Sequence, residues 1–488
     1  MSPERFRALG HALVDQIAGL LESIPNRPVT RDQSPSAVRD ALGLNGDLPE
    51  DGEDAAALLD SAARLIADRS LFNGHPRFFG YITAPPAPIG ILGDFLAAAL
   101  NPNVGAWVLS PAASEIERQT VRWIAQLIGY AEDCGGLLVS GGNMANLVCF
   151  FAARAAGAGW GVREDGVNDG SRPRLRAYGS AETHTWIQKA ADLSGVGTSA
   201  VRWIATDDRQ RMDVAALRTQ IAADRAAGDR PFIVIGTAGS VSTGAVDPLP
   251  EIAALCREER IWFHVDGAYG GFAAAASDAP DDLRGLREAD SVAVDPHKWL
   301  YAPLEAGCAL VRDAGALRRA FAYHPPYYHF YHFDEQATNF VDFGMQNSRG
   351  FRALKVWLAL RQAGAAGYRR MIAADIELSR EMARAVEARD DLELITQELS
   401  ITTFRYVPRD LRGRSEEEAV AKYLDTLNRE LLSAIQRGGE AFVSNAVVQG
   451  RFVLRACIVN FHTTIEDVRA VAEIAGRTGT ALDARMRS

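Results

Sequence analysis

"SVAVDPHKWL" occupies residues 291–300 and joins an apolar strand pattern to a charged side chain. Its first four residues are small or β-branched, which predicts a short strand buried in a sheet. The chain then turns at Pro296 and presents Lys298 close behind the strand. A charged amine in this place needs an explanation, because most lysines extend their amines into solvent at the surface.

Short apolar runs of this kind alternate with helical patterns over the middle of the chain. Strands that alternate with helices form a mostly parallel sheet that is buried on both faces, and ligands then bind at the carboxyl ends of the strands. We therefore expect an α/β domain built on a mostly parallel seven-stranded sheet. The seven runs are "LLVS", "LRAYGS", "VRWIAT", "PFIVIGT", "IWFHVD", "SVAVD" and "CALVR".

The two ends of the chain have different patterns. The beginning reads as amphipathic helices, and the first of them carries an apolar stripe without an obvious local partner, which hints at a dimer. The end contains closely spaced strands and a final helix, which is typical of an antiparallel sheet with helices on one side. We expect an N-terminal helical segment packed on a partner subunit (1–85), a large domain (86–360) and a small C-terminal α+β domain (361–488).

Composition and charge exclude several classes of protein. The 488 residues are 48% hydrophobic and 23% charged, as in ordinary soluble proteins, and the net charge of -10 disfavours non-specific binding to nucleic acid or anionic lipid. The chain has neither a signal-peptide pattern nor an apolar run long enough to span a bilayer, so we expect no membrane partner. Its five cysteines form no C-x-x-C pair, which fits a reducing cytoplasm and predicts neither a metal site nor disulfides.

Two further polar features stand where the predicted sheet opens. "LLVSGGNMANLV" (137–148) is a strand, a glycine turn and a helix start, so its backbone could bind an anion, although a tight turn alone explains it as well. Asp266 ends an apolar strand and either caps a helix or pairs with a cation or a protonated ring nitrogen. A desolvated lysine amine, such as that of Lys298, attacks carbonyl groups. Together, the three features match the phosphate, ring nitrogen and aldehyde of pyridoxal phosphate.

The same residues carry a resemblance to a known family. "DPHKW" (295–299) is similar to the N/D-P-H-K-W motif of the group II pyridoxal-phosphate decarboxylases, which include aromatic amino acid and glutamate decarboxylases. "HVDGAYGG" (264–271) is similar to the family's H-V-D-A-A-Y-G/A-G. The resemblance covers most of the chain and implies fold type I, as in aspartate aminotransferase. It also implies a homodimer with shared active sites, in which residues 101–111 reach across to the partner.

The resemblance implies a role for each matching residue. Lys298 would form the Schiff base with the cofactor, Asp266 would pair with the pyridine nitrogen, and His184 would stack on the ring. Trp186 stands near a position where the family usually has serine. The remaining implied cofactor contacts are Gly142, Asn143, Thr237, Ser240, Ala268 and His297, and His297 would also assist the exchange of amines. Without the resemblance, His184 reads as a helix-start or core histidine, and loop hydroxyls such as those of Thr237 and Ser240 mostly cap turns.

The implied reaction is loss of CO2 from an amino acid, and the substrate is less well determined. Tyr327 matches the family tyrosine that donates a proton after CO2 leaves, and relatives with phenylalanine there tend to release an aldehyde instead, so we expect an amine. Tyr81 and Arg349 match residues near the substrate, although Arg349 could instead be structural and pair with a carboxylate such as Asp342. The many aromatic residues beside Tyr327 favour an aromatic substrate.

Several alternatives remain open. They are decarboxylation of glutamate or aspartate, a pyridoxal-dependent aldehyde synthase, a carbon–sulfur lyase, and a weakly indicated metal or regulatory site at His324, His329 and His332.

Overall fold

The computed structural model describes all residues except 44–45, 168–169 and 327–336. The described chain separates into two compact units, of which one contains Ile82–Ser379 and Thr396–Ile401 and the other contains Met1–Tyr81, Arg380–Ile395 and Thr402–Ser488. The N-terminal segment and most of the C-terminal region therefore belong to one unit. The boundary expected at residue 360 falls inside helix α13 (Ala353–Glu387), which changes direction at Gly364.

The larger unit is built on a seven-stranded sheet with the order β2-β8-β7-β6-β5-β3-β4. The pairs from β7 to β4 are parallel, whereas β8 runs antiparallel to both β2 and β7, so the expected mostly parallel sheet is confirmed. Each of the seven apolar runs forms one strand. Their bounds are β2 Gly135–Val139, β3 Leu175–Ser180, β4 Val201–Ile204, β5 Arg230–Thr237, β6 Trp262–Asp266, β7 Ser291–Val294 and β8 Gly307–Val311.

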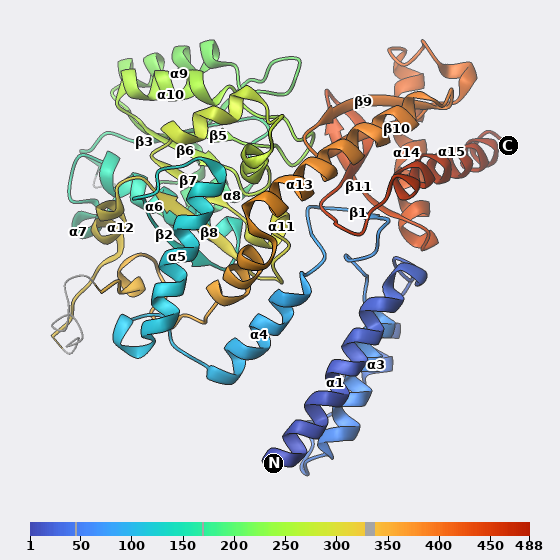
Figure 1. Cartoon of the computed structure of the whole chain (residues 1–488). Helices are drawn as coiled ribbons and strands as arrows, with labels where there is room; N and C mark the ends of the chain where they lie inside the picture. The colour runs from blue at the N-terminus through green and yellow to red at the C-terminus, as the bar shows by residue number, and fades with distance from the viewer. Residues whose placement is uncertain (44–45, 168–169, 327–336) are drawn as a thin grey trace. The chain divides into compact units, whose positions relative to one another are not determined.

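Helices cover this sheet because its strands consist largely of buried apolar residues. All residues of β7 are buried, and α6 packs against β7 and β8 while α9 and α10 pack against β5 (Figure 1). Burying both faces removes the branched side chains from water, which is the main favourable contribution to folding. The helices of this unit before α13 are α4 Pro88–Leu100, α5 Pro111–Ile128, α6 Gly142–Gly157, α7 Val162–Asp165, α8 Trp186–Leu193, α9 Val214–Ala226, α10 Leu249–Glu259, α11 Pro296–Trp299 and α12 Ala314–Phe321.

The other unit contains a five-stranded sheet with the order β1-β11-β12-β10-β9. The strands expected near the C-terminus are β9 Leu392–Glu398, β10 Ile401–Tyr406, β11 Phe442–Val448 and β12 Arg451–Cys457, and they are accompanied by α14 Glu418–Gly438 and α15 Ile465–Arg487. Strand β1 (Phe78–Phe79) was not expected, and it pairs in parallel with β11. The N-terminal segment therefore adds an edge strand to the C-terminal sheet.

The N-terminal helices leave their apolar stripe only partly covered. Helices α1 (Pro3–Ser23) and α3 (Ala55–Arg69) lie side by side (Figure 1), and α2 spans Pro35–Leu42. None of the described residues of these three helices is buried. The stripe of the first helix thus has a local partner, α3, but one that does not bury it. In the part of the chain that the structure describes, every helix is too short or too polar to cross a membrane.

Candidate active site

Neighbouring strands bring the predicted cofactor residues to one edge of the seven-stranded sheet. Thr237 at the end of β5 is in register with Asp266 at the end of β6, and Asp266 is in register with Ala293 of β7. Lys298 follows β7 on the short helix α11. Because parallel strands end at the same edge of a sheet, these three residues lie at one edge although at least 29 positions separate each from the next along the chain.

Lys298 is held in place by a carboxylate that the sequence analysis did not select. Its Nζ lies 3.0 Å from Oδ2 of Asp295, whose side chain is 2% exposed. The neighbouring Trp299 is fully buried and anchors α11 to the core. Asp295 could have been found by the reasoning applied to Asp266, because it too is a carboxylate at the end of an apolar strand.

His297 shares this carboxylate. Its Nε2 lies 3.7 Å from Oδ2 of Asp295, and its Nδ1 lies 2.7 Å from the carbonyl oxygen of Ala306, to which it donates when protonated. Burial lowers the pKa of His297, and the charge of Asp295 partly opposes this shift. Burial therefore favours the neutral form of this imidazole, which belongs to the residue next to Lys298 in the chain.

Asp266 receives one hydrogen bond on each of its carboxylate oxygens. The indole N–H of Trp186 donates to Oδ2 at 2.6 Å, and the backbone N–H of Ala268 donates to Oδ1 at 3.1 Å. The carboxylate and Ala268 are both buried. The sequence marked Trp186 only as a departure from a usual serine, and no local pattern connects it with Asp266, which lies 80 positions further on.

His184 follows β3, and its side chain is exposed at the same edge. Its Nδ1 accepts the backbone N–H of Trp186 at 3.3 Å. Partial burial lowers the pKa of His184, the charge of Asp266 opposes this shift, and Lys298 adds to it. A neutral and accessible imidazole is suited to stacking on an aromatic ring.

The glycine turn between β2 and α6 has no room for side chains. Gly141 has a φ of 129°, a conformation that favours glycine, and a Cβ atom on Gly142 would lie 2.7 Å from Oδ2 of Asp295. Helix α6 starts at Gly142 and continues for 16 residues, with the exposed Asn143 in its first turn. The unpaired backbone N–H groups of this turn could bind a phosphate.

The hydroxyl groups near this edge differ in their contacts. Thr237 is buried, and among the described residues its Oγ1 has no hydrogen-bond partner. Its backbone N–H donates to Asp247 at 2.8 Å, and burial raises the pKa of that carboxyl to about 7. Oγ of Ser240 lies 3.0 Å from Oγ1 of Thr243. A buried hydroxyl without a partner, a glycine cradle, a carboxylate and an amine together fit the chemistry of pyridoxal phosphate.

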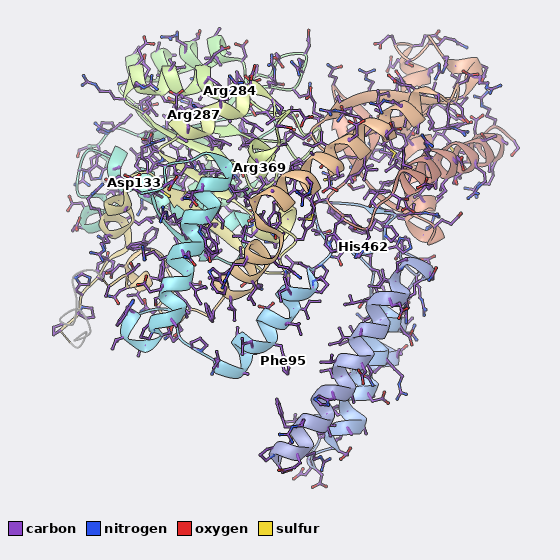
Figure 2. The ribbon with its side chains drawn as sticks, in the orientation of Figure 1. Phe95, Asp133, Arg284, Arg287, Arg369 and His462 are labelled. Atoms are coloured by element: carbon purple, nitrogen blue, oxygen red, sulfur yellow. The ribbon has the colours of Figure 1, made fainter. Side chains whose placement is uncertain are left out.

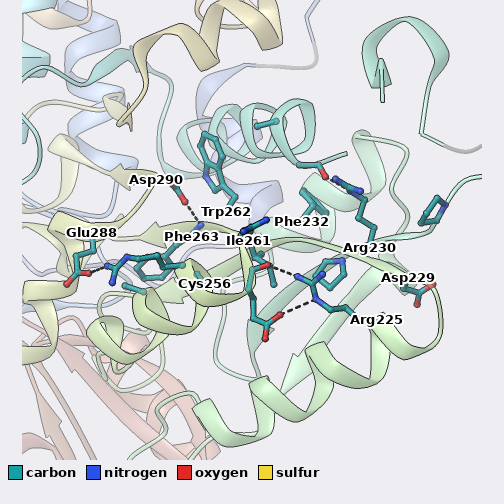
Figure 3. A pocket seen from close by; sticks show the side chains of 18 residues that line it. Arg225, Asp229, Arg230, Phe232, Cys256, Ile261, Trp262, Phe263, Glu288 and Asp290 are labelled. Carbon is teal, nitrogen blue, oxygen red and sulfur yellow. Dashed lines mark hydrogen bonds and ion pairs between the residues drawn. The ribbon is translucent and has the colours of Figure 1, made fainter. Parts of the chain in front are cut away.

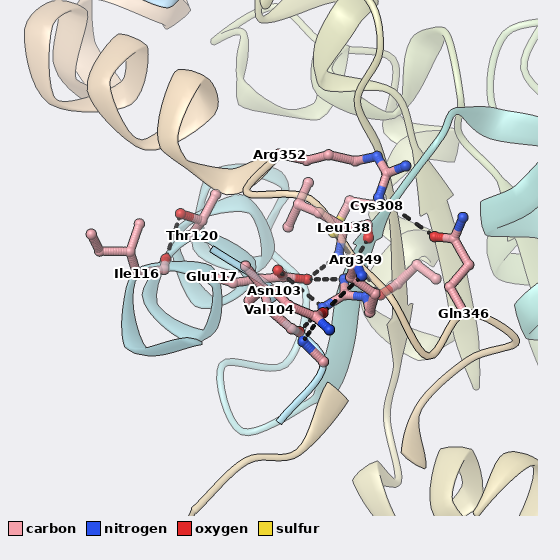
Figure 4. A network of polar contacts seen from close by, with 12 residues as sticks. Asn103, Val104, Ile116, Glu117, Thr120, Leu138, Cys308, Gln346, Arg349 and Arg352 are labelled. Carbon is pink, nitrogen blue, oxygen red and sulfur yellow. Dashed lines mark hydrogen bonds and ion pairs between the residues drawn. The ribbon is translucent and has the colours of Figure 1, made fainter. Parts of the chain in front are cut away.

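Arg349 lies in a buried ion pair (Figure 4). Both of its Nη atoms donate to the carboxylate of Glu117, and they also donate to the carbonyl oxygens of Val104 at 2.9 Å and Leu138 at 2.7 Å. The structural alternative, a pair with a carboxylate, is thus confirmed, with Glu117 as the partner and not Asp342, which lies 3.3 Å from His324. The contacts of Arg349 are those of a structural ion pair, and its substrate contact stays a prediction.

Two other predicted residues are not placed at this edge. Tyr81 belongs to the unit with the five-stranded sheet, where its ring centroid lies 6.2 Å from that of Phe442 and its N–H donates to Ser444. Tyr327 lies outside the described residues, as do His329 and His332 of the alternative metal site. The described ranges contain no cluster of three or more His, Cys, Asp or Glu side chains suited to a metal ion.

A cavity of about 680 Å³ opens at the opposite, amino-terminal ends of β5, β6 and β7 (Figure 3). Four of its eight charged side chains pair with one another, Arg225 with Glu259 and Arg257 with Glu288. None of the described site residues lines this cavity. Its volume alone therefore does not mark it as the active site.

Comparisons with known proteins identify the family of this chain. The family model of the pyridoxal-dependent decarboxylase conserved domain matches residues 35–407. The chain is 33% identical to an aromatic-L-amino-acid decarboxylase of Bacillus atrophaeus over 96% of its length and 94% of the relative's. It is 28% identical to a phenylacetaldehyde synthase of a Rosa hybrid cultivar, over 94% of this chain and 90% of that protein.

Among solved structures, Oryza sativa TDC with PLP and tryptamine superimposes with a TM-score of 0.89 at 28% identity, and 99% of each chain is covered. The predicted fold type and cofactor are thereby confirmed. This chain belongs to the family of pyridoxal-dependent decarboxylases.

Proposed function

We propose that this pyridoxal-phosphate-dependent decarboxylase acts on an aromatic L-amino acid and releases the amine and CO2. The observation that carries the proposal is the placement of Lys298, Asp266 and the glycine turn at one edge of the sheet. Pyridoxal phosphate, when bound, accepts the electron pair left by the departing carboxylate. The side chains of this protein bind the cofactor, orient it and transfer the protons of the reaction.

The ion pair of Lys298 defines the first task of the site. An ammonium group must lose a proton before it attacks a carbonyl. His297 is next to Lys298 in the chain and shares the carboxylate of Asp295 with it, and its neutral form accepts a proton, whereas Asp295 already balances the charge of the amine. We assign the covalent bond to Lys298 and the transfer of its proton to His297.

The remaining residues hold the cofactor and return a proton to the product. Asp266, oriented by its two donors, holds a proton on the ring nitrogen, and His184 covers the ring. Thr237 and Ser240 are assigned with Gly142 and Asn143 to the phosphate end. Tyr327 is assigned as the proton donor to Cα of the substrate, so the product is an amine.

Two arguments support an aromatic substrate. The relative from Bacillus atrophaeus is an aromatic-L-amino-acid decarboxylase. In addition, both Nη atoms of Arg349 donate to Glu117 and to backbone carbonyl oxygens. This arginine is therefore not free to bind the second carboxylate of glutamate or aspartate. A decarboxylase of acidic amino acids would need another cation at the substrate.

A second candidate function is an aromatic aldehyde synthase, because the relative from Rosa is a phenylacetaldehyde synthase. The test is to supply the purified protein with pyridoxal phosphate and single amino acids while CO2, amine and hydrogen peroxide are measured. We expect CO2 and amine from tyrosine, tryptophan, phenylalanine or DOPA, and peroxide only in Tyr327→Phe. Peroxide and aldehyde from the unaltered protein would favour the synthase, and turnover of glutamate alone would contradict the aromatic substrate.

We also propose that the protein works as a homodimer. Helix α4 is strongly apolar, yet its Leu92, Phe95, Leu96 and Leu100 are 53%, 51%, 50% and 64% exposed (Figure 2 labels Phe95). Asp94 on the same helix binds Lys355 at 3.1 Å, which holds α4 in place. Exposed apolar surface of this kind marks a protein interface, and a second copy of the chain would cover it. Residues 101–111 follow α4 and are proposed to reach the partner's site.

Sedimentation of the protein tests this assembly. We expect a dimer for the unaltered chain and a monomer with weak activity for Phe95→Glu combined with Leu96→Glu, because two carboxylates in an apolar interface resist desolvation. Leu193→Glu, at an exposed leucine of α8, is the matched control and should sediment unchanged. We further infer a cytoplasmic location, which the five free cysteines support because reduced thiols persist in that compartment.

A further inference from the structure

We propose that Trp186 is a positioning residue for Asp266, whose carboxylate its indole N–H holds in the orientation that meets the ring nitrogen of the cofactor. The inference rests on the cofactor role proposed for Asp266 and adds a residue that determines how this role is performed. It depends on three observations, namely the hydrogen bond itself, the packing of the indole ring and the neutral histidine behind it.

The hydrogen bond removes a freedom that an aspartate otherwise has. Rotation of a carboxylate about its last side-chain bond is soft, so a single contact does not determine its plane. Asp266 has a donor on each oxygen, the Trp186 indole at 2.6 Å and the Ala268 backbone at 3.1 Å. The backbone donor, Ala268, is only two residues from Asp266 and moves with it. Trp186 lies on a different element, α8, and therefore fixes the carboxylate relative to the rest of the fold.

The indole ring can serve as a fixed donor because it is itself immobilised. Trp186 is the first residue of α8 and is 2% exposed. Its ring meets Phe150 edge-on, with centroids 6.3 Å apart and planes at 82°, and meets His264 in the same way at 5.6 Å and 86°. Rotation of the indole would displace both rings, and so the direction of its N–H is set by packing.

His264, which packs edge-on against the indole, is itself held by two hydrogen bonds. It is fully buried two positions before Asp266 on β6, so both side chains point to the same face of the sheet. Its Nε2 lies 2.7 Å from Oδ1 of Asn146, and its Nδ1 lies 2.9 Å from Oγ of Ser291. Burial lowers the pKa of His264 to about 4. The imidazole is neutral at pH 7 and brings no charge that would compete with the cofactor for Asp266.

Trp186 also contacts the second predicted ring partner of the cofactor. Its backbone N–H donates to Nδ1 of His184 at 3.3 Å, which places the imidazole proton on Nε2. One residue thus connects the carboxylate at the ring nitrogen with the histidine assigned to the ring face.

An indole differs from the serine that is usual near this position in the family. A hydroxyl both donates and accepts and rotates freely, whereas an indole N–H only donates and has one direction. Trp186 is therefore a more rigid partner for Asp266 than a serine hydroxyl would be. We expect the gain to affect cofactor affinity and the protonation of the bound ring, rather than the stability of the fold.

The test compares Trp186→Phe with Trp357→Phe. Trp357 is the matched control because its indole also donates to a side-chain oxygen, that of Gln119 at 2.7 Å, and it lies on α13 outside the contacts of Trp186 described above. Apoprotein is titrated with pyridoxal phosphate, and the absorbance of the bound cofactor is followed between pH 6 and 9. We expect Trp186→Phe to raise the dissociation constant about tenfold or more, as the loss of a hydrogen bond to a charged group does, and to shift the spectral titration. Trp357→Phe should change neither.

A second variant separates the donor from its packing. In Trp186→His, the imidazole ring takes the place of the five-membered ring of the indole, and its Nε2 takes the place of the donor Nε1. This variant keeps an N–H donor but loses more packing than Trp186→Phe does. Tighter cofactor binding in the histidine variant than in the phenylalanine variant supports the donor, and the reverse order overturns it.

The background Asp266→Asn completes the test. If Trp186 acts through Asp266, Trp186→Phe has no further effect on cofactor affinity when the carboxylate is absent. An equal effect in both backgrounds means general packing and overturns the proposal. An unchanged cofactor affinity and spectrum in Asp266→Asn alone would overturn the cofactor role of Asp266 and this inference with it. An effect of Asp266→Asn without one of Trp186→Phe would overturn only the role of Trp186.

Discussion

The two ends of β5, β6 and β7 both gather charged residues, but they do so in opposite ways. At the carboxyl ends, Asp266 and Asp295 are buried; Asp266 accepts two hydrogen bonds, and Asp295 pairs with Lys298. At the amino ends, the cavity of about 680 Å³ is surrounded by exposed pairs such as Arg257 and Glu288, whose side chains are 68% and 36% exposed. Water screens the charges of the exposed pairs at the amino ends, whereas the buried carboxylates at the carboxyl ends act in a low dielectric.

The difference teaches that charge and volume are poor guides to chemistry. A buried carboxylate interacts strongly with whatever meets it, and its orientation is fixed by the fold. An exposed ion pair changes little when a ligand arrives, because solvent already satisfies it. The active site is therefore expected at the edge with few, buried and oriented groups.

The largest effect that can test this comparison is the loss of Lys298. We expect Lys298→Ala to lose the absorbance of the covalently bound cofactor near ~420 nm and to reduce turnover by about three orders of magnitude or more. Lys422→Ala, at one of the three other lysines and exposed on α14, is the control. Retention of the band in Lys298→Ala would move the covalent bond to another lysine.

The buried pair of Glu117 and Arg349 offers the next largest effect. Their side chains are 0% and 1% exposed, so Glu117→Gln leaves the guanidinium charge without its counterion in the interior. We expect a loss of about 3–5 kcal/mol in the free energy of unfolding, measured by urea denaturation of the apoprotein. A loss below about 1 kcal/mol would show that the pair behaves like an exposed one and would weaken the comparison.

A third test uses the pH dependence of stability that His264 confers. Its pKa is about 4 in the folded protein and about 6.5 when unfolded, so the unfolded chain binds more protons between these values. The contribution to the free energy of unfolding is full above pH 6.5 and falls by about 3 kcal/mol as the pH decreases to 4. We expect His264→Gln to flatten the change in urea midpoint from pH 7.5 to 4.5. His11→Gln, at an exposed histidine of α1, should keep the original slope.

The smallest effect is expected at the amino ends of the strands. Arg257→Ala removes one member of an exposed ion pair, and we expect the free energy of unfolding to change by less than about 1 kcal/mol with unchanged cofactor affinity and turnover. A marked loss of activity in this variant would show that the cavity takes part in function and would reverse the conclusion drawn from the two ends.

Much of the fold could be predicted from the sequence, because the information is local. Apolar runs of the right length, bounded by turns, identified all seven strands of the larger sheet. A charged residue at the end of such a run identified Lys298 and Asp266, and a glycine pair between strand and helix identified the turn at Gly142. Each of these inferences needed only the residues within one element and its flanking turn.

The contacts between distant elements were decided by the tertiary structure alone. Trp186 reaches Asp266 across 80 positions, Glu117 meets Arg349 across 232, and Phe78 pairs with Phe442 in the smaller sheet. Local patterns report whether a residue is buried, but not which residue lies opposite, because that depends on strand order and on the direction in which each side chain leaves its element. The sequence by itself determined which groups could do chemistry, and the packing of the strands decided which of them meet.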